Sequence, residues 1–476
     1  MNNRIIAGLA VASLAGVSCT TAAPEEEKVN ILWLFGEDIS PWMPAYGDNT
    51  VETPNIDYLI DNGVLFTNCY ASCSVSSPSR SAIITGAMQT SIGMHNHRTG
   101  RTPDVEYKLP EGVEVLPQIM RREGFFTFNA GKDDFNWQYN WSDYWAGECT
   151  QKRFFGKEGD PTISWLNREG DEPFFGVIEL FGGKNHKLDV EPIDPSTVVV
   201  PPYYPNMPFM QEYMSSHYNQ IKQTDYEIGN IIERMKADGV WENTIIIFMS
   251  DNGYQTLRDK QFLYDGGIHM PFVVAAPGNL KLLEKFGIER GVREDMISLI
   301  DVAATTLAIA GVEIPKYMES QDIFAEDFHR DFIVAARDRC DFTIDRIRAI
   351  RTKEFKYIRN FMTDRALMQP QYRDKTSHYK EFMSEWKAGA KFADEWLSDE
   401  RPAEELYDVV NDPHEIHNLA ADPKYAGELE AMRQRLDGWI EQTGDKGQYP
   451  ESVEKLKVLL DRWGERCVNS EYDAAR

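Results

Sequence analysis

Residues 76–86 read SSPSRSAIITG, and this stretch decides how the rest of the chain is interpreted. Pro78 suits the first position of a helix, because its missing N–H would be unpaired there and its ring presets φ. Gly86 suits the residue just past the helix end, which often adopts a left-handed conformation. We therefore predict a short helix with Ser76 just ahead of it. The unpaired N–H groups at such a helix start favour a bound anion, and Arg80 adds a cation one turn in.

Continuous apolar runs predict strands that are buried on both faces of a sheet. These runs are Val29–Phe35, Phe174–Leu180, Thr244–Met249 and Pro271–Ala276. Between the second and third of these runs, apolar residues from Met214 to Met235 recur at helical spacing, and Gly239 closes the pattern. Alternating strands and helices predict an α/β fold, with a mostly parallel sheet flanked by helices on both faces.

Acidic pairs follow two of these strands. Glu37 and Asp38 come after the first strand, and Asp251 and Asn252 come after the strand that begins at Thr244. In such sheets ligands bind beyond the carboxyl ends of the strands, so we expect the pairs to share a site. Their oxygen donors suit Ca²⁺ or Mg²⁺. One pair alone would favour simple solvation of a loop, but two pairs together with Ser76 favour a metal site.

The stretch at residues 76–86 resembles the signature of the type I, formylglycine-dependent sulfatases, which is Cys or Ser, any residue, Pro, Ser and Arg, followed by Thr-Gly. The resemblance implies an alkaline-phosphatase-like fold. It also implies that Ser76 is oxidised to formylglycine (3-oxoalanine) by a serine-type anaerobic sulfatase-maturing enzyme. A plain serine would leave a stable sulfated enzyme, whereas the hydrated aldehyde has a second hydroxyl that expels sulfate. In this family the two acidic pairs hold Ca²⁺, and Glu37 here stands where the family has Asp.

The same resemblance assigns cations to the site. Gly131-Lys132 is similar to a Gly-Lys-x-His segment of the family, with Asp134 in the place of the His. Lys260 is similar to a lysine that binds a sulfate oxygen, and His186 falls where a second His faces the leaving group. Singly, each lysine is more often a solvated surface charge. The implied catalytic set is listed here: Ser76, Arg80, Lys132, His186 and Lys260.

Softer similarities favour the N-sulfoglucosamine sulfohydrolases within this family. They rest on residues 199–206 and 368–372. The expected reaction is hydrolysis of sulfate esters or N-sulfate groups of a glycosaminoglycan-like carbohydrate, with N-sulfated glucosamine as the first candidate. Candidate sugar contacts are Asp134, His95, His97 and Arg98. The His-x-His pair could also be a metal site, or a loop pair satisfied by the backbone.

Near residue 340 the pattern changes. Ile347–Arg351 and Phe355–Asn360 predict an antiparallel hairpin, and an amphipathic helix follows from about Tyr425 to Thr443. This region resembles the small C-terminal subdomain of sulfatases. We therefore expect a catalytic domain at residues 29–340 and an antiparallel α+β subdomain at residues 341–476.

The N-terminal sequence predicts that the protein is exported from the cytoplasm. Residues 1–23 combine a charged start with a short apolar run, as in a secretory signal peptide, and Cys19 lies in a sequence similar to a bacterial lipobox. We expect a protein of the bacterial cell envelope, either periplasmic or lipid-anchored to the outer membrane. No other segment predicts a membrane span. None of the six cysteines shows a zinc-ligand spacing with histidine.

The formal net charge of −26 disfavours nucleic acid as a partner. A sulfated substrate is also anionic, so the site would need a local cluster of cations. Two other classes of function stay open. One is a phosphatase or phosphodiesterase of the same architecture that uses Ser76 directly, although such enzymes usually hold two zinc ions through several histidines. The other is a binding protein for sulfated glycans in which Ser76 is never oxidised.

Overall fold

The computed structural model describes residues 28–98, 106–146, 164–180, 182, 188–389 and 394–476. The predicted signal peptide, with Cys19, and His186 lie outside the described residues. Among the described helices, none is long and apolar enough to cross a membrane. Four cysteines of the described part are buried free thiols: Cys69, Cys73, Cys340 and Cys467.

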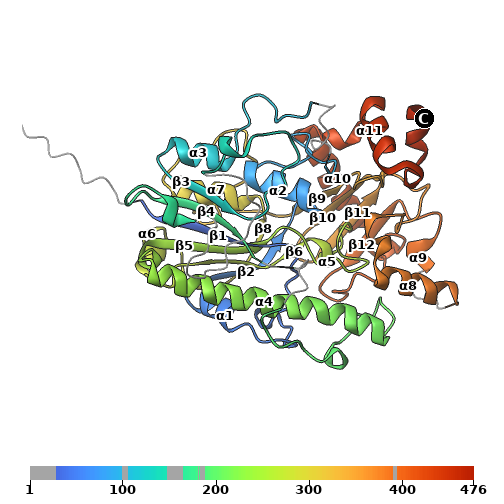
Figure 1. The fold of residues 1–476 in the computed structure, drawn as a ribbon. Helices are drawn as coiled ribbons and strands as arrows, with labels where there is room; N and C mark the ends of the chain where they lie inside the picture. The colour runs from blue at the N-terminus through green and yellow to red at the C-terminus, as the bar shows by residue number, and fades with distance from the viewer. Residues whose placement is uncertain (1–27, 99–105, 147–163, 181, 183–187, 390–393) are drawn as a thin grey trace, which may run out of the picture.

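An eight-stranded sheet, sheet A, forms the centre of the molecule (Figure 1). Its strands are β1 (Asn30–Gly36), β2 (Gly63–Tyr70), β3 (Phe126–Ala130), β4 (Phe174–Glu179), β5 (Thr244–Ser250), β6 (His269–Met270), β7 (Phe272–Ala275) and β8 (Gly291–Ser298). Their order is β3-β4-β1-β5-β7-β2-β6, with β8 beside β2. Strands β3, β4, β1 and β5 run parallel to one another, as do β2 and β8. Strand β7 runs antiparallel to β5 and β2, and β6 runs antiparallel to β2, so the sheet is mixed.

Helices cover both faces of sheet A. They are α1 (Pro54–Asp61), α2 (Ser76–Thr85), α3 (Leu116–Arg122), α4 (Pro208–Ala237), α5 (Asp265–Ile268), α6 (Lys281–Lys285) and α7 (Asp301–Ile309). Figure 1 shows α2, α3 and α7 on one side of the sheet, with α1 and the long α4 on the other.

Strand β1 shows why the sheet is buried on both faces. Its residues Ile31, Trp33 and Phe35 join the hydrophobic core that contains residues of α2, α3 and α7. Leu32 and Leu34 join the core that contains residues of α1 and α4. Because successive side chains of a strand point to opposite faces, a continuous apolar run supplies both cores.

The elements predicted from apolar patterns are present. Strands β1, β4, β5 and β7 match the predicted runs to within one residue at each end. Helix α4 contains the predicted helical pattern and begins earlier than it, at Pro208. The predicted α/β fold, with a mostly parallel central region and helices on both faces, is confirmed.

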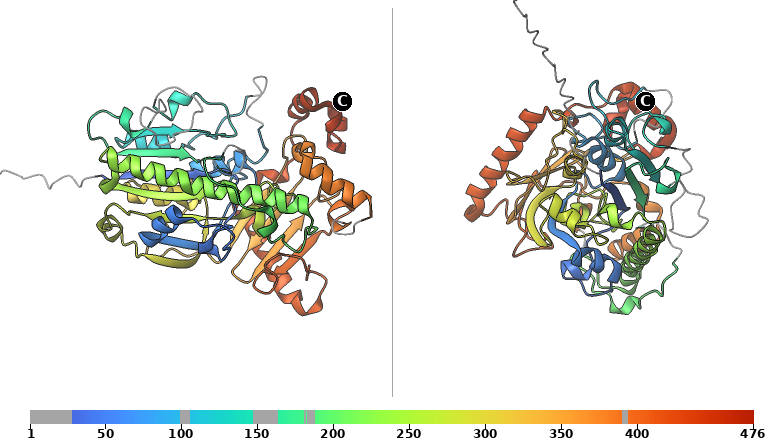
Figure 2. Two further views of the ribbon diagram at one scale, coloured as in Figure 1. Left: turned by 60° about the horizontal axis from the view of Figure 1, so that its bottom comes forward. Right: turned by 90° about the vertical axis from the view of Figure 1, so that its left-hand side faces the viewer.

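A second sheet, sheet B, lies at one end of sheet A (Figure 2). Its antiparallel strands, in the order β12-β11-β10-β9, are β9 (Ile333–Arg337), β10 (Ile347–Arg351), β11 (Phe355–Asn360) and β12 (Glu404–Asp408). The predicted hairpin is the β10–β11 pair, with both strands at the predicted bounds. The accompanying helices are α8 (Ser377–Lys387), α9 (Asp394–Leu397), α10 (Ala426–Thr443) and α11 (Val453–Trp463). Helix α10 is the predicted C-terminal helix.

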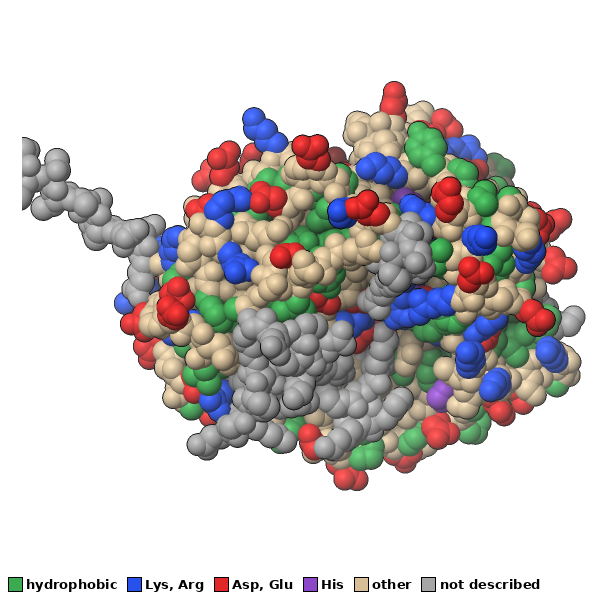
Figure 3. Space-filling model, turned by 45° about the horizontal axis from the view of Figure 1, so that its top comes forward, with side chains coloured by type: hydrophobic (Ala, Val, Ile, Leu, Met, Phe, Trp, Pro, Cys, Tyr) green, Lys and Arg blue, Asp and Glu red, His purple; other side chains and the backbone are tan. Residues whose placement is uncertain are grey.

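Buried ion pairs anchor sheet B from inside. The Arg348 guanidinium on β10 is fully buried, and it pairs with Asp338 at 3.0 Å and with Asp445 at 2.8 Å. Its cross-strand neighbour on β11, Arg359, is partly exposed and pairs with the largely exposed Asp437. Lys and Arg side chains also gather on the surface at this end of the molecule, at the right of Figure 3.

The two cross-strand arginines provide a matched test. We expect Arg348→Met to lower the free energy of unfolding by about 3–5 kcal/mol, because two buried carboxylates lose their counter-charge. We expect Arg359→Met to cost less than about 1 kcal/mol, because its pair is solvent-screened. Urea unfolding followed by circular dichroism measures both changes. Equal shifts for the two variants would show that burial does not set the strength of these pairs.

Candidate active site

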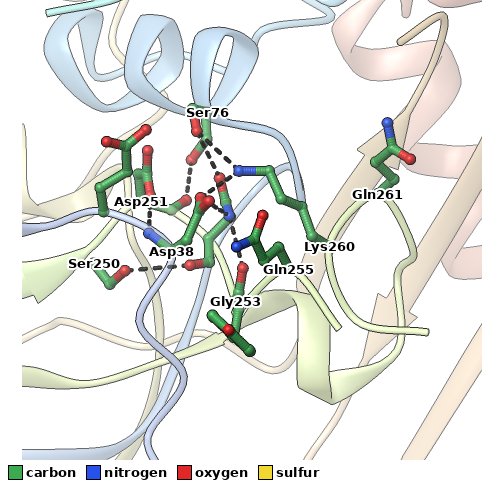
Figure 4. A network of polar contacts seen from close by, with 12 residues as sticks. Asp38, Ser76, Ser250, Asp251, Gly253, Gln255, Lys260 and Gln261 are labelled. Carbon is green, nitrogen blue, oxygen red and sulfur yellow. Dashed lines mark hydrogen bonds and ion pairs between the residues drawn. The ribbon is translucent and has the colours of Figure 1, made fainter. Parts of the chain in front are cut away.

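The N-terminus of α2 places Ser76 above the ends of β1 and β5 (Figure 4). The helix begins two residues earlier than predicted: Val75 is the N-cap, Ser76 is the first helical residue and Pro78 is the third. The prediction for the helix start was therefore wrong, because a proline is tolerated anywhere in the first turn, where N–H groups have no intrahelical partner. The predicted end is confirmed, since Gly86 has a left-handed φ of 65°.

The Ser76 hydroxyl is buried among polar groups. It donates a hydrogen bond to Oδ1 of Asn252 at 3.1 Å, and Nζ of Lys260 donates to its Oγ at 3.4 Å. Only 3% of the residue is exposed. Ser76 therefore contacts two residues of the predicted site, one from the metal set and one from the cation set.

The two acidic pairs meet, as predicted from their strands. Strands β1 and β5 are parallel neighbours with Gly36 opposite Ser250, so the residues that follow them lie side by side. Carboxylate oxygens of Glu37, Asp38 and Asp251 lie within 4.8 Å of one another, and all three side chains are buried. Hydrogen bonds tighten this arrangement. The Asp38 N–H donates to Asp251 Oδ1 at 3.1 Å, and the side-chain amide of Asn252 donates to Asp38 Oδ1 at 2.8 Å.

Two lysines reach this cluster from different loops. Nζ of Lys132 lies 2.5 Å from Oε1 of Glu37 and 2.9 Å from Oδ2 of Asp134. Nζ of Lys260 forms an ion pair with Asp38. Lys260 is almost fully buried, whereas a quarter of the Lys132 side chain is exposed, so Lys132 faces the more open side of the cluster.

Arg80 lies beneath the carboxylates. Its Nε donates to Oδ2 of Asp251 at 2.8 Å, its Nη1 donates to the carbonyl of Lys132 at 2.9 Å, and its guanidinium lies over the ring of Phe35. Burial alone would lower the pKa of Arg80, but the carboxylates of Asp251, Glu179 and Glu37 raise it above its ordinary value. The guanidinium is thus a permanent positive charge, fixed in orientation by three partners.

Glu179 belongs to the same network, and it is not among the site residues predicted from the sequence. It is the last residue of β4, the strand beside β1. Its Oε1 lies 3.4 Å from Nη2 of Arg80, and its Oε2 accepts the Lys132 N–H at 2.6 Å. Gly131 permits this approach, because a Cβ there would lie 2.5 Å from Cβ of Glu179. The sequence signal that could have identified Glu179 is an acidic residue at the end of a predicted buried strand.

Charged groups of both signs meet in this network. Among the described ionisable groups in contact, the carboxylates are Glu37, Asp38, Asp134, Glu179 and Asp251, and the cations are Arg80, Lys132 and Lys260. The clustered carboxylates offer hard oxygen ligands, which suit a divalent cation such as Ca²⁺ or Mg²⁺.

The C-terminal part of the chain reaches the site through Arg373. Its Nη1 donates to the carbonyls of Gln255 and Thr256, and its Nη2 donates to the carbonyl of Lys260, each at 2.7 Å. Gln371 orients the guanidinium by accepting from its Nε at 2.9 Å. The buried Arg373 thus holds the backbone of the loop that carries Lys260.

The remaining predicted residues lie elsewhere or outside the described part. His95 and His97 are buried, whereas Arg98 is partly exposed. His97 contacts Asp341 and Cys340, which are outside the carboxylate cluster. Burial lowers the pKa of His97 to about 4. His186 lies outside the described residues.

The chain is similar to known families and proteins. The family profile described as Sulfatase matches residues 29–312, and the profile described as N-sulphoglucosamine sulphohydrolase, C-terminal, matches residues 253–381. An ulvan-active sulfatase of Formosa agariphila is 30% identical, over 90% of this chain and 77% of that protein. The N-sulphoglucosamine sulphohydrolase of Homo sapiens is 26% identical, over 60% of this chain and 62% of that protein.

Solved structures share the fold. A 2-O GAG sulfatase superimposes with a TM-score of 0.62 at 18% identity, over 89% of this chain and 94% of that chain. A phosphonate monoester hydrolase of Agrobacterium radiobacter gives 0.62 at 18% identity, over 87% and 96%. The architecture is therefore alkaline-phosphatase-like, and at these identities the structures show the fold alone.

The match to the Sulfatase profile and the similarity to the ulvan-active sulfatase go further than the fold. The chain belongs to the sulfatase family. Its members are sulfuric ester hydrolases that act on sulfated substrates, and they generally depend on formylglycine and a divalent metal ion.

We expect Arg373 to affect turnover because it positions Lys260. We expect Arg373→Ala to lower kcat by about 10²-fold, because displacement of a charged group by about an ångström has that effect. The matched control is Lys375→Ala, which removes a cation from the same short helix at an exposed position and should leave kcat unchanged. Sulfatase assays with thermal denaturation separate positioning from unfolding. A lowered melting temperature with full kcat in the folded fraction would contradict the positioning role.

Proposed function

We propose that this protein is a carbohydrate sulfatase of the bacterial cell envelope in which Ser76 is oxidised to formylglycine. The observation that carries the proposal is the position of the Ser76 hydroxyl, within hydrogen-bond reach of both Asn252 and Lys260 at the edge of three clustered carboxylates. The proposed partner in maturation is a serine-type anaerobic sulfatase-maturing enzyme. In its absence Ser76 stays a plain hydroxyl.

We assign Ca²⁺ to the site, held by Glu37, Asp38, Asp251 and Asn252. All four offer hard oxygen ligands, which suit Ca²⁺, and Mg²⁺ is the alternative ion. The bound ion supplies charge neutralisation to the sulfate oxygens. Glu37 supports this role despite its extra methylene, because its carboxylate lies within the cluster.

The cations of the chain are placed to bind the sulfate group. Lys132 and Lys260 approach the cluster from different loops, and each already faces a carboxylate. Arg80 holds Asp251 in place through a charge-assisted hydrogen bond. Such preorganised charges stabilise an anionic transition state without reorganisation. Asp134 orients Lys132, and His186 is assigned the proton transfer to the leaving group.

For the substrate we propose a sulfated glycosaminoglycan-like sugar, with N-sulfated glucosamine as the first candidate. The support is the match of residues 253–381 to the C-terminal region of N-sulphoglucosamine sulphohydrolases. Among the predicted sugar contacts we retain Arg98, because His95, His97 and Asp134 each bury more than nine-tenths of their surface. The basic side chains at the right of Figure 3 favour approach of a polyanion to an otherwise acidic protein.

The modification of Ser76 can be measured directly. We expect the peptide Ala71–Arg80, from protein made with a serine-type maturase, to be lighter by two hydrogen atoms and to trap a hydrazine at Ser76. Ser77→Ala is the control variant, because it removes a neighbouring hydroxyl at the unspecified position of the signature and should keep the modification. An unmodified Ser76 under these conditions would favour the phosphatase or the glycan-binding protein, and hydrolysis of a phosphate ester with added Zn²⁺ would distinguish those two.

The metal assignment predicts a difference between two substitutions of Glu37. We expect Glu37→Gln to weaken Ca²⁺ binding at least about tenfold, because Ca²⁺ affinity depends on the number of ligand charges. Glu37→Asp keeps the charge and should bind Ca²⁺ close to the original affinity. Titration calorimetry on chelator-treated protein measures both, and turnover should follow the bound fraction. Equal affinities for the two variants would place the ion away from Glu37.

A further inference from the structure

A second group of metal-binding side chains lies outside the carboxylate cluster. It consists of His97, Cys340 and Asp341, all buried. Nδ1 of His97 lies 3.7 Å from Sγ of Cys340 and 3.3 Å from Oδ1 of Asp341. The three ligand atoms all lie within 4.8 Å of one another. One sulfur, one nitrogen and one oxygen donor thus converge in the interior.

The spacing of these atoms fits the edges of a zinc tetrahedron. With zinc bonds of about 2.3 Å to sulfur and about 2.0 Å to nitrogen or oxygen, tetrahedral angles give edges of about 3.6 Å between sulfur and nitrogen and about 3.3 Å between nitrogen and oxygen. The observed separations are 3.7 and 3.3 Å. Thiolate and imidazole donors also favour zinc over the calcium that suits the carboxylate cluster.

The backbone presents the three side chains to one point. Cys340 and Asp341 occupy a tight turn, closed by reciprocal backbone hydrogen bonds between Cys340 and Thr343, in which Asp341 has a left-handed φ of 49°. The N–H of His97 donates to the carbonyl of Arg339 at 3.0 Å. Nη1 of Arg339 also donates to the carbonyls of His97 and Asp341, which fixes the two ligand-bearing segments together.

We propose that His97, Cys340 and Asp341 bind a zinc ion that is separate from the metal ion of the active site, with water as the fourth ligand. Cys340 loses its thiol proton to solvent on binding, so the thiolate and the Asp341 carboxylate together neutralise the ion. His97 binds as the neutral imidazole. The nearby charge of Arg339 is already balanced by Glu451, with which it forms a buried ion pair.

The proposed zinc site adjoins the loop of Lys260. The side-chain amide of Gln261 donates to Sγ of Cys340 at 2.8 Å, and the Gln261 N–H donates to the carbonyl of Ser74 at 3.0 Å. Figure 4 shows Lys260 directed toward Ser76 and the next side chain, Gln261, directed away from it. Hydrogen bonds from an outer residue to a zinc-bound sulfur tune and orient the ligand. The zinc ion would thus pin residues 97 and 340 beside the catalytic loop.

Cobalt substitution provides the test, because only a sulfur ligand gives a near-ultraviolet thiolate-to-cobalt charge-transfer band. We expect the full-length protein, stripped of metal and loaded with Co²⁺, to show this band and to bind Zn²⁺ stoichiometrically by elemental analysis. Cys340→Ser should abolish the band. The matched control Cys73→Ser changes a buried thiol of the same hydrophobic cluster and should keep it. The carboxylate cluster has no sulfur and gives no such band.

Three results would overturn the proposal: no band in the unaltered protein, a band that persists in Cys340→Ser, or a band lost only in Cys73→Ser. If Cys340→Ser does not fold, X-ray absorption at the zinc edge of the unaltered protein decides the question. A sulfur shell at about 2.3 Å supports the site, and a shell of oxygen and nitrogen alone contradicts it. Neither readout depends on sulfatase turnover, so failure of the proposed function would leave the result unaffected.

Discussion

The active site depends on one electrostatic constraint, the burial of several carboxylates at the ends of three adjacent parallel strands. Glu37, Glu179 and Asp251 end up together because β4, β1 and β5 are neighbours in the sheet. Isolated charges in such a place would be too costly to keep ionised, so cations must enter from elsewhere. Arg80 comes from α2, and Lys132 and Lys260 come from loops. The elements around the site must therefore hold these three cations close to the carboxylates.

The C-terminal part of the chain helps to hold a cation beside the carboxylates without itself supplying the charge. Arg373 binds the backbone of the Lys260 loop, and the side chain of Gln261 on the same loop reaches Cys340 in the segment between β9 and β10. Sheet B is in turn fixed by its own buried arginine, Arg348. A lysine that faces a buried carboxylate needs a rigid main chain, and two contacts from the C-terminal part of the chain, through Arg373 and Cys340, support it.

Much of this could be predicted from the sequence, because the informative patterns are local. Buried strands can be recognised in the sequence as apolar runs. Residues that follow neighbouring parallel strands lie at the same edge of the sheet. This rule was enough to predict that Asp38 and Asp251 lie close together. The helix start at Ser76 was misplaced by two residues, because proline is compatible with several first-turn positions. Arg373 and the contact of His97 with Cys340 could not be predicted, since they join segments more than a hundred residues apart with no spacing rule. Glu179 could have been found by the rule that located Glu37.

The way Arg373 holds its loop bears on how this protein can diverge. On this loop the guanidinium contacts main-chain carbonyl oxygens, at residues 255, 256 and 260, and every amino acid carries such a carbonyl. Side chains at positions 255 and 256 can therefore be exchanged without loosening the attachment. Substitutions in the loop beside the proposed sulfate site could therefore change the sugar specificity during evolution. The ammonium group of Lys260 would keep its position facing Ser76.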